Sequence, residues 1–345
     1  MRKTTQRVLA MIAAGALVLV ACGDDGDEAA DFRACLVTDE GGVDDASFNE
    51  TAFNGLVRAR DELGIDIAYL ESSSETDYEP NVQAFLDQDC GIIITVGFLL
   101  GETTEQAAIN NPDQLFAIVD YAYDANYDNL RELVFATEEA AFLAGYVAAA
   151  TTETGVLGTY GGINIPPVTV FMDGYLAGAR YHNAEHGTDV QVLGWDGSDG
   201  LFTGNFDSLD DGRNVTDDLL QAGADIILPV AGPVGRGSLT AIEDFGSGLV
   251  IWVDTDGTMT VPQQASLLLT SIMKNMDVAV FESVQGAFEG SFQSGLYVGT
   301  LANGGVGIAP YYDNEDRVPQ QARDRVSELT DAIIAGELSV SPADH

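Results

Sequence analysis

From residue 32 onward, short apolar runs alternate with amphipathic stretches. Apolar runs bounded by turn residues, such as residues 35–38 and 92–96, predict strands buried within parallel sheets. Stretches with apolar residues at helical spacing, such as residues 48–63 and 138–150, predict helices that cover those strands. This alternation of strands and helices indicates an α/β protein with parallel sheets covered by helices.

The alternation divides into two successive sets, which predict two open-sheet lobes. Lobe I is expected over residues 32–150 and lobe II over residues 151–265. Residues 266–345 are expected to supply a hinge crossover and the C-terminal helices, and part of this segment returns to lobe I. Ligands of open α/β sheets bind beyond the carboxyl ends of the strands, where the strand order reverses. Two facing lobes would therefore place both sets of strand ends around one cleft.

The chain begins with the pattern of an export signal. Basic residues precede an apolar run over residues 8–21 that is short for a transmembrane helix and ends in Leu-Val-Ala-Cys at positions 19–22. This ending resembles a bacterial lipobox, so residues 1–21 are expected to be a lipoprotein signal peptide and residues 22–31 a flexible tether. Lipid on Cys22 would anchor the protein to the extracytoplasmic face of the cell membrane. The alternative is an ordinary secretory signal with a coincidental cysteine.

The charge balance limits the possible partners. The chain has 14 basic and 55 acidic residues, and its formal net charge is −41. A surface this acidic repels phosphate backbones, so nucleic acid is not expected as a partner. The only lysines are Lys3 and Lys274, and removal of the signal peptide would leave Lys274 as the sole lysine.

Cys35 and Cys90 each stand at the start of an apolar run. If the two runs form neighbouring parallel strands, the sulfur atoms could meet, and an exported protein can keep a disulfide. The alternative is two buried thiols that act as small apolar side chains. The sequence leaves both possibilities open.

Five segments, in a fixed order, carry a resemblance to a known family. They read GGVDDASFN at 41–49 after a strand-end aspartate, EAAFLAG at 139–145, GPVG at 232–235, VDTD at 253–256, and LTS at 269–271 with Lys274. Together they resemble the basic membrane protein lipoproteins, the purine nucleoside receptor A-like branch of the solute-binding proteins that feed ABC transporters. The resemblance covers essentially the whole mature chain.

This resemblance has implications for fold, ligand and partners. It implies a type I periplasmic-binding-protein-like fold, with two doubly wound parallel-sheet lobes and a hinge. It implies a purine nucleoside as the small-molecule ligand and ABC permease and ATPase subunits as partners. A monomer without a cofactor is expected.

The first motif offers groups that suit a nucleobase. Asp39 follows a predicted strand, where its carboxylate can accept hydrogen bonds from N–H groups, and the ring of Phe48 can stack on a base. The resemblance implies that Asp39, Phe48 and Asn49 hold the base. Lobe II is expected to supply a facing ring from the loop after the strand at 190–193. Phe202 is preferred there over Phe206, which could instead pack beneath the loop.

The later motifs offer polar groups that suit a ribose. Asp254 and Asp256 stand at the end of a predicted strand, and a carboxylate there can accept from two neighbouring hydroxyl groups. The resemblance implies that Lys274 contacts the ribose. It also implies a backbone contact near Gly232, where glycine lets the chain approach a ligand closely, although a simple tight turn is the alternative.

One departure from the family concerns the residues before the helix at 139–145. The family often has an aspartate there, whereas Phe135 is followed by Ala136 and Thr137 in this chain. The corresponding sugar contact is then missing or weakened, or Thr137 or Glu138 takes it.

A catalytic role is not expected from these patterns. His182 and His186 fit the H-x-x-E-H pattern of zinc peptidases, but they end a helix, where cationic side chains suit the dipole, and no third ligand is evident. The expected function is a lipid-anchored receptor that captures a nucleoside and delivers it to an ABC importer, with no metal site. The alternatives are a nucleoside-processing enzyme on the same fold and a ligand-sensing co-receptor.

Overall fold

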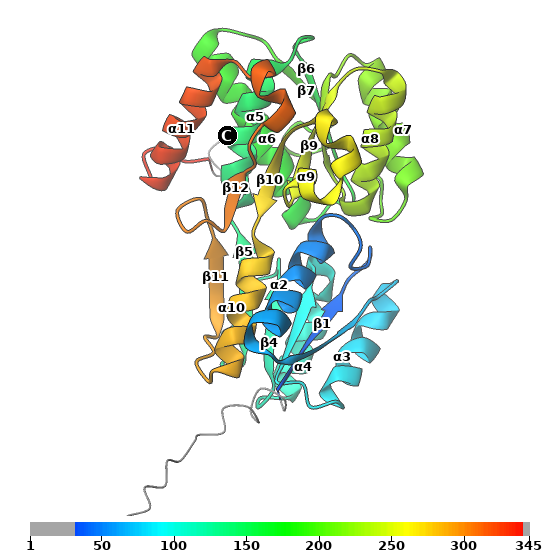
Figure 1. The fold of residues 1–345 in the computed structure, drawn as a ribbon, viewed down its shortest axis with the longest axis vertical. Coiled ribbons are helices and arrows are strands. Elements are labelled where there is room, and N and C mark those ends of the chain that lie inside the picture. Colours follow the sequence, from blue (N-terminus) through cyan, green and yellow to red (C-terminus); the bar gives the residue numbers. More distant parts are fainter. Residues whose placement is uncertain (1–31, 341–345) are drawn as a thin grey trace, which may run out of the picture.

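The computed structural model describes residues 32–340, which form two lobes stacked along the long axis of the molecule (Figure 1). Each lobe contains a six-stranded sheet that helices cover. The predicted α/β class and the hinged pair of doubly wound lobes are confirmed. The expected signal peptide, the lipidation site at Cys22 and the tether lie outside the described residues.

The sheet of lobe I is parallel throughout and has the strand order β11-β5-β4-β3-β1-β2. Its strands are β1 (Arg33–Thr38), β2 (Asp66–Leu70), β3 (Ile92–Val96), β4 (Leu115–Val119), β5 (Leu130–Phe135) and β11 (Gly295–Gly299). The central strands are almost continuously buried because helices cover both faces, as parallel sheets require.

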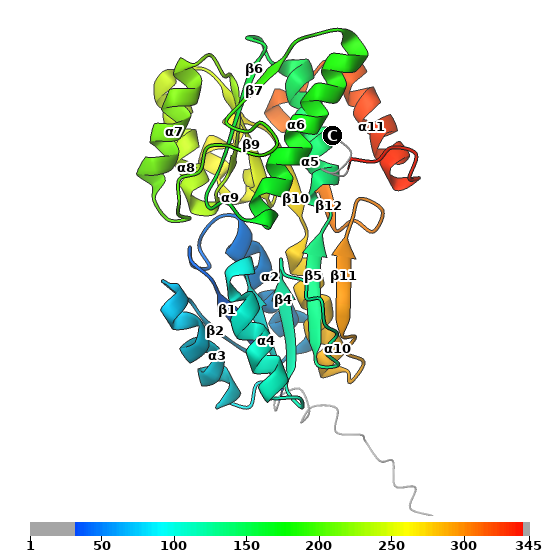
Figure 2. The ribbon, with the colours of Figure 1, turned by 180° about the vertical axis from the view of Figure 1, so that it is seen from behind.

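Two pairs of helices cover this sheet. One face carries α2 (Phe48–Leu63) and α10 (Met276–Phe288), and the other carries α3 (Tyr78–Leu86) and α4 (Gly101–Asn110) (Figures 1 and 2). Alternate strand residues point to opposite faces, so Leu36 packs on the α2 side and Val37 on the α3 side. Two 3₁₀ turns complete the lobe, η1 (Glu75–Asp77) and η2 (Phe98–Leu100).

The sheet of lobe II has the strand order β12-β10-β9-β8-β6-β7. Its strands are β6 (Val156–Gly161), β7 (Gln191–Leu193), β8 (Ile226–Val230), β9 (Leu249–Asp254), β10 (Leu268–Lys274) and β12 (Val306–Ile308). All neighbouring strands are parallel except β10 and β12, which pair antiparallel.

Helices also cover both faces of the second sheet. They are α5 (Thr137–Thr151), α6 (Pro166–His186), α7 (Leu209–Gln221), α8 (Gly235–Phe245), α9 (Gly257–Thr260) and α11 (Gln320–Ile334), with 3₁₀ turns η3 (Gly232–Val234), η4 (Pro262–Leu267) and η5 (Tyr312–Arg317). The pair α5 and α6 lies on one face, with α11 against α5, while α7 and α8 lie on the other face (Figure 2).

Within the described residues, the chain crosses between the lobes three times. The crossings follow β5 at Ala136, follow β10 at Asn275, and connect β11 to β12 through residues 300–305. Backbone hydrogen bonds join these segments: the N–H of Ala136 donates to Gly299 at 2.8 Å, and the N–H of Asn275 donates to Gly305 at 2.9 Å. The three crossings therefore form one hinge.

The structure corrects the predicted boundary between the lobes. The first crossing is at residue 136 rather than near residue 150, because α5 packs on α6 of lobe II. Glycines allow this close packing: a Cβ atom at Gly145 or Gly178 would collide with the backbone of the facing helix. Lobe II also includes β10 and α11 from the segment after residue 265. Alternation of strands and helices does not reveal which sheet a helix covers.

Within residues 32–340, no helix has both the length and the apolar character needed to cross a membrane.

Lobe I contains a covalent cross-link. Cys35 in β1 and Cys90, just before β3, form a disulfide with their Cα atoms 6.0 Å apart. The two strands are parallel neighbours, which brings the two sulfur atoms together inside the core.

Removal of this disulfide should destabilise the protein. The bridge joins residues 55 positions apart, and a loop of that size restricts the unfolded chain. We expect the Cys35→Ala/Cys90→Ala variant to lose about 2–4 kcal/mol of unfolding free energy, measured by urea denaturation. Mass spectrometry under non-reducing conditions provides the control on the parent protein, and two free thiols in the folded parent would contradict the bridge.

Candidate functional site

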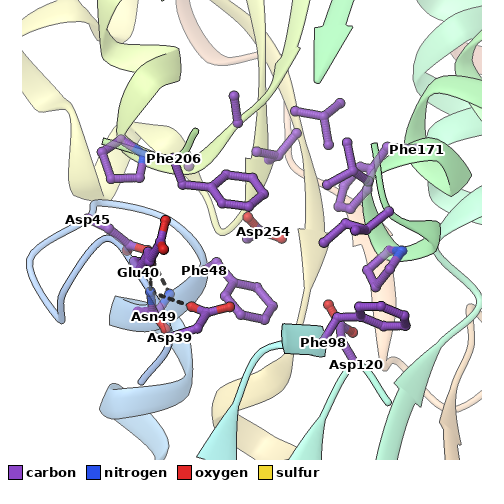
Figure 3. Close-up of a pocket in the computed structure, with 18 of the residues that line it drawn as sticks. Asp39, Glu40, Asp45, Phe48, Asn49, Phe98, Asp120, Phe171, Phe206 and Asp254 are labelled. Atoms are coloured by element: carbon purple, nitrogen blue, oxygen red, sulfur yellow. Dashed lines mark hydrogen bonds between the residues drawn. The ribbon is translucent and has the colours of Figure 1, made fainter. Parts of the chain in front are cut away.

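A pocket lies between the lobes, at the carboxyl ends of strands from both sheets (Figure 3). Its empty space, counted together with the part open to solvent, is about 560 Å³. Lobe I contributes Asp39, Phe48, Asn49, Phe98 and Asp120, among others, and lobe II contributes Phe171, Phe206, Gly232, Asp254 and Lys274. The pocket therefore has aromatic walls and several charged groups.

The strand order reverses beside the pocket in both lobes. In lobe I the chain runs from β1 outward to β2 and then returns to β3 on the other side of β1. In lobe II, β6, β7 and β8 repeat this arrangement. The connections leave room at such a point, which is where open α/β sheets bind ligands.

Asp45 fixes the start of α2 at the pocket. Its carboxylate accepts hydrogen bonds from three backbone N–H groups, those of Ser47, Asn49 and Glu50, at 2.8–3.0 Å. These are N–H groups that the first turn of a helix leaves without a helical partner. Burial raises the pKa of Asp45 to about 7, although the three N–H bonds favour its charged form. This cap holds the neighbouring Phe48 at the pocket wall.

Asp39 directly follows β1 and lies at one side of the pocket. Its carboxylate accepts from the Asn49 Nδ2 group at 3.4 Å, and that group also donates to the Glu40 carbonyl at 3.2 Å (Figure 3). Burial raises the pKa of Asp39 well above its usual range. The charged groups that act on it are carboxylates, so no cation among them opposes this rise.

The opposite side of the pocket contains a buried ion pair. The Lys274 ammonium donates to the Asp120 carboxylate, and Lys274 is only 2% exposed. Lys274 ends β10 of lobe II and Asp120 follows β4 of lobe I, so the pair links the lobes beside the hinge. Burial raises the pKa of Asp120, and the adjacent ammonium opposes this rise.

Asp254 is a second carboxylate near Lys274. Burial raises its pKa, and Lys274 and a hydrogen bond from the Ser47 hydroxyl oppose the rise. This bond, at 2.7 Å, crosses from lobe I to lobe II. Asp120 and Asp254 have backbone φ angles of +67° and +70°, a strained conformation for a residue other than glycine that is tolerated most readily by aspartate and asparagine.

Aromatic rings enclose the ion pair. The Lys274 ammonium lies 5.1 Å from the ring centre of Phe48, 5.5 Å from that of Phe135 and 5.7 Å from that of Phe171. A cation within about 6 Å of a ring face is attracted by the ring electrons. The rings also exclude water, which strengthens the attraction between Lys274 and Asp120.

The structure places the two candidate rings of lobe II differently. The backbone of Phe202 pairs with Gly161 at the end of β6, and its ring packs edge-to-face on Trp195 with the centres 6.0 Å apart. Phe202 is therefore held in the lobe beside the sheet, whereas Phe206 lines the pocket. Sequence position in one loop did not distinguish the two rings.

Asp256 also does not line the pocket. Its carboxylate accepts from the N–H of Thr258 at 3.0 Å and from that residue's hydroxyl at 2.8 Å, which caps the short helix α9. Tyr312 donates its hydroxyl to the same carboxylate. Asp256 therefore serves the fold of this loop, although its sequence position resembles that of Asp254.

The pocket brings together six of the predicted ligand-binding residues. They are Asp39, Phe48, Asn49, Gly232, Asp254 and Lys274. Thr137 and Glu138 do not line it. The Thr137 hydroxyl turns back to the Phe135 carbonyl at 3.4 Å.

The sequence prediction missed Asp120, Phe98 and Phe171 in the lining. Asp120 had the same signal as Asp39, since it directly follows a buried strand. Phe98 likewise comes shortly after β3, so a position just beyond a strand end was a signal that could have identified both residues. Phe171 lies inside α6, and nothing in the helical pattern separates it from core residues.

The histidine pair at the end of α6 lies outside this pocket. The rings of His182 and His186 are 4.6 Å apart, and His186 hydrogen-bonds to the Tyr146 hydroxyl at 3.0 Å. Across residues 32–340, no three histidine, cysteine, aspartate or glutamate side chains are grouped to hold a metal ion.

Comparison with known proteins identifies the family. Residues 32–343 match the family model described as "ABC transporter substrate-binding protein PnrA-like". The chain belongs to this PnrA-like family. It is 30% identical to the CD4+ T-cell-stimulating antigen of Listeria monocytogenes over 365 residues, 98% of each chain. It is 29% identical over 364 residues, 99% of each chain, to a Lactococcus lactis protein named ABC transporter nucleoside-binding protein BmpA.

A solved structure agrees with this family. A solute-binding protein of an ABC transporter system from Aeropyrum pernix superposes with a TM-score of 0.82 and 28% identity, over 89% of this chain and 92% of that chain. The PnrA-like family consists of substrate-binding proteins rather than enzymes. The chain is therefore a substrate-binding protein of ABC transport, and the alternative of a nucleoside-processing enzyme is not supported.

In this PnrA-like protein, the Lys274–Asp120 pair should govern lobe closure. Lys274→Met leaves a buried carboxylate without its cation, which typically costs about 3–5 kcal/mol, and opening of the lobes relieves the cost by hydrating Asp120. We expect a larger radius of gyration in X-ray scattering for Lys274→Met. The double variant Lys274→Met/Asp120→Asn should return toward the parent value. Equal scattering from the parent and the single variant would contradict a role in closure.

Proposed function

We propose that this protein captures a purine nucleoside between its lobes and delivers it to an ABC importer. The observation that supports this most is the division of the pocket into two chemically different ends. One end has Asp39 and Asn49 beside Phe48 and Phe206, and the other has Lys274 with the carboxylates of Asp120 and Asp254, with aromatic rings around both ends. A flat base with polar edges fits the first end, and a sugar with several hydroxyl groups fits the second. The naming of the Lactococcus lactis relative as nucleoside-binding supports the same ligand class.

The base is held between rings from opposite lobes. Phe48 comes from lobe I and Phe206 from lobe II, and Figure 3 shows both rings pointing into the pocket. Stacking of a base on an aromatic ring contributes about 1–3 kcal/mol and tolerates different bases. Asp39 and Asn49 lie beside these rings and meet the polar edge of the base.

The ribose lies at the end of the pocket that contains Lys274. The carboxylates of Asp120 and Asp254 accept hydrogen bonds from sugar hydroxyl groups, and the Lys274 ammonium donates to hydroxyl oxygen atoms. Hydrogen bonds to charged groups contribute about 1.5–3 kcal/mol each. Because the two carboxylates come from different lobes, a bound ribose stabilises the closed arrangement.

Family membership and the expected export signal support the delivery step. A substrate-binding protein of this family presents its ligand to a permease and an ATPase of an ABC system. Lipidation at Cys22 would keep it near the membrane, on the extracytoplasmic face. A co-receptor role without transport is the remaining alternative, and loss of nucleoside uptake in cells that lack the protein would distinguish transport from it.

Two phenylalanines of the same loop provide a matched test of nucleoside binding. Phe206 lines the pocket and Phe202 does not. We expect Phe206→Leu to weaken guanosine and inosine by roughly 5- to 150-fold in calorimetry, because about 1–3 kcal/mol of stacking is lost. Phe202→Leu should leave both dissociation constants unchanged. Absence of nucleoside binding by the parent protein would refute the proposed ligand.

The lipid anchor can be tested with Cys22. The Cys22→Ala protein lacks the thiol that receives diacylglycerol, so we expect it in the soluble exported fraction instead of the membrane fraction. Fractionation and immunoblotting measure the distribution, and the parent protein serves as the control. Retention of the variant in the membrane would mean that another anchor exists.

A further inference from the structure

Of the three pocket carboxylates Asp39, Asp120 and Asp254, Asp39 alone has no close cation among the described residues. Asp120 is paired with Lys274, and Asp254 accepts from a hydroxyl and lies near the same lysine. Within residues 32–340, the Asp39 carboxylate accepts only the 3.4 Å hydrogen bond from Asn49. It packs so closely against Gly97 that a Cβ atom there would overlap it. Its environment therefore does little to stabilise a negative charge.

The titratable groups around Asp39 add to this effect. Glu40 adjoins it, Asp45 faces it from the loop before α2, Asp120 from the end of β4, and Tyr78 from α3. The three carboxylates raise the pKa of Asp39 further, in addition to the larger effect of burial. Uptake of a proton by Asp39 therefore relieves both its burial as a charged group and the repulsion from its neighbours.

Asn49 lies next to Asp39, and its amide has the same hydrogen-bonding groups at any pH. Its Nδ2 donates to Asp39 and to the Glu40 carbonyl, while its Oδ1 is buried without a hydrogen-bond partner among residues 32–340 (Figure 3). A buried acceptor without a partner costs free energy, so a hydrogen bond from a ligand donor to this oxygen would be favourable. The amide offers an acceptor to the base at any pH, whereas Asp39 offers an acceptor or a donor according to its proton.

We propose that the protonation state of Asp39 selects between two classes of purine base. This inference rests on the proposed nucleoside function. The ionised carboxylate accepts from the ring N–H of a 6-oxopurine, as in inosine. The protonated carboxyl donates to the bare ring nitrogen of a 6-aminopurine, as in adenosine, while its other oxygen accepts from the amino group. Binding of adenosine to the ionised protein therefore takes one proton from solvent, and binding of inosine takes none.

The sign of the pH dependence follows from this proton balance. Affinity for adenosine falls as the pH rises, by up to about tenfold per pH unit where one full proton is taken up. Affinity for inosine falls as the pH decreases into the range where Asp39 of the free protein is protonated. The ratio of the two affinities consequently reverses or shifts strongly with pH.

Calorimetry with adenosine and inosine tests the proposal on the mature protein. Titrations between about pH 5 and pH 8 cover the range in which a carboxyl with a raised pKa titrates. Buffers with different ionisation enthalpies count the protons that are taken up. As the pH rises, we expect proton uptake on adenosine binding to approach one and proton release on inosine binding to approach zero, with opposite pH trends in affinity.

Two variants identify the responsible group. Asp39→Asn has a fixed donor and a fixed acceptor, so it should abolish the proton uptake and flatten both pH profiles. Asp256→Asn removes another carboxylate near a strand end, outside the pocket, and should retain the parent profiles. If Asp39→Asn fails to fold, the proton count in the parent protein still decides the outcome.

The outcomes separate this inference from the proposed function. Binding of both nucleosides with parallel pH profiles and no proton uptake would overturn the selector and leave the nucleoside function intact. Proton uptake that persists in Asp39→Asn would overturn it as well, because another group would be responsible. If only one of the two nucleosides binds at every pH, the selector is overturned and the nucleoside function stands. If neither binds at any pH, the proposed function is refuted together with the inference.

Discussion

The buried attraction between Lys274 and Asp120 is the interaction on which the arrangement of the lobes depends. Each charge loses its hydration when the lobes meet, and each compensates the other only in that arrangement. The three surrounding phenylalanine rings increase both effects, because they exclude water and attract the ammonium. Since Lys274 is also the last residue before the second hinge crossing, a change in its partner acts directly where the lobes rotate.

The two lobes supply equivalent carboxylates to this lysine. The strands β4 and β9 occupy matching positions in the two sheets. In lobe I, β4 is the second strand from β1 on the side away from β2, and in lobe II, β9 is the second strand from β6 on the side away from β7. Asp120 follows the first of these strands and Asp254 ends the second, and both have left-handed backbone angles near +70°. The same strained turn in both lobes aims a carboxylate at the shared cleft, and the surrounding sheets hold the strain in place.

The sequence predicted the features that depend on residues close together in the chain. Buried apolar runs identified the central strands, and the position of Asp39 and Asp254 at strand ends placed them at the cleft. The lobe assignment of α5 was wrong, because it depends on glycine contacts with a helix far along the chain. Phe202 lies outside the pocket lining for a similar reason, since an isolated backbone bridge joins it to Gly161 of β6. Such tertiary contacts leave no periodic signal.

The charge composition of the pocket explains why a ligand would drive closure. Asp39, Asp120 and Asp254 are all buried, and Lys274 is the one cation in the lining described. Closure therefore desolvates more negative than positive charge, which opposes it unless donors or protons replace the lost water. A ligand with several hydroxyl and N–H groups provides such donors to both lobes at once, and a purely apolar ligand of equal size does not. The aromatic walls then add affinity, but the polar groups determine whether the closed state is reached.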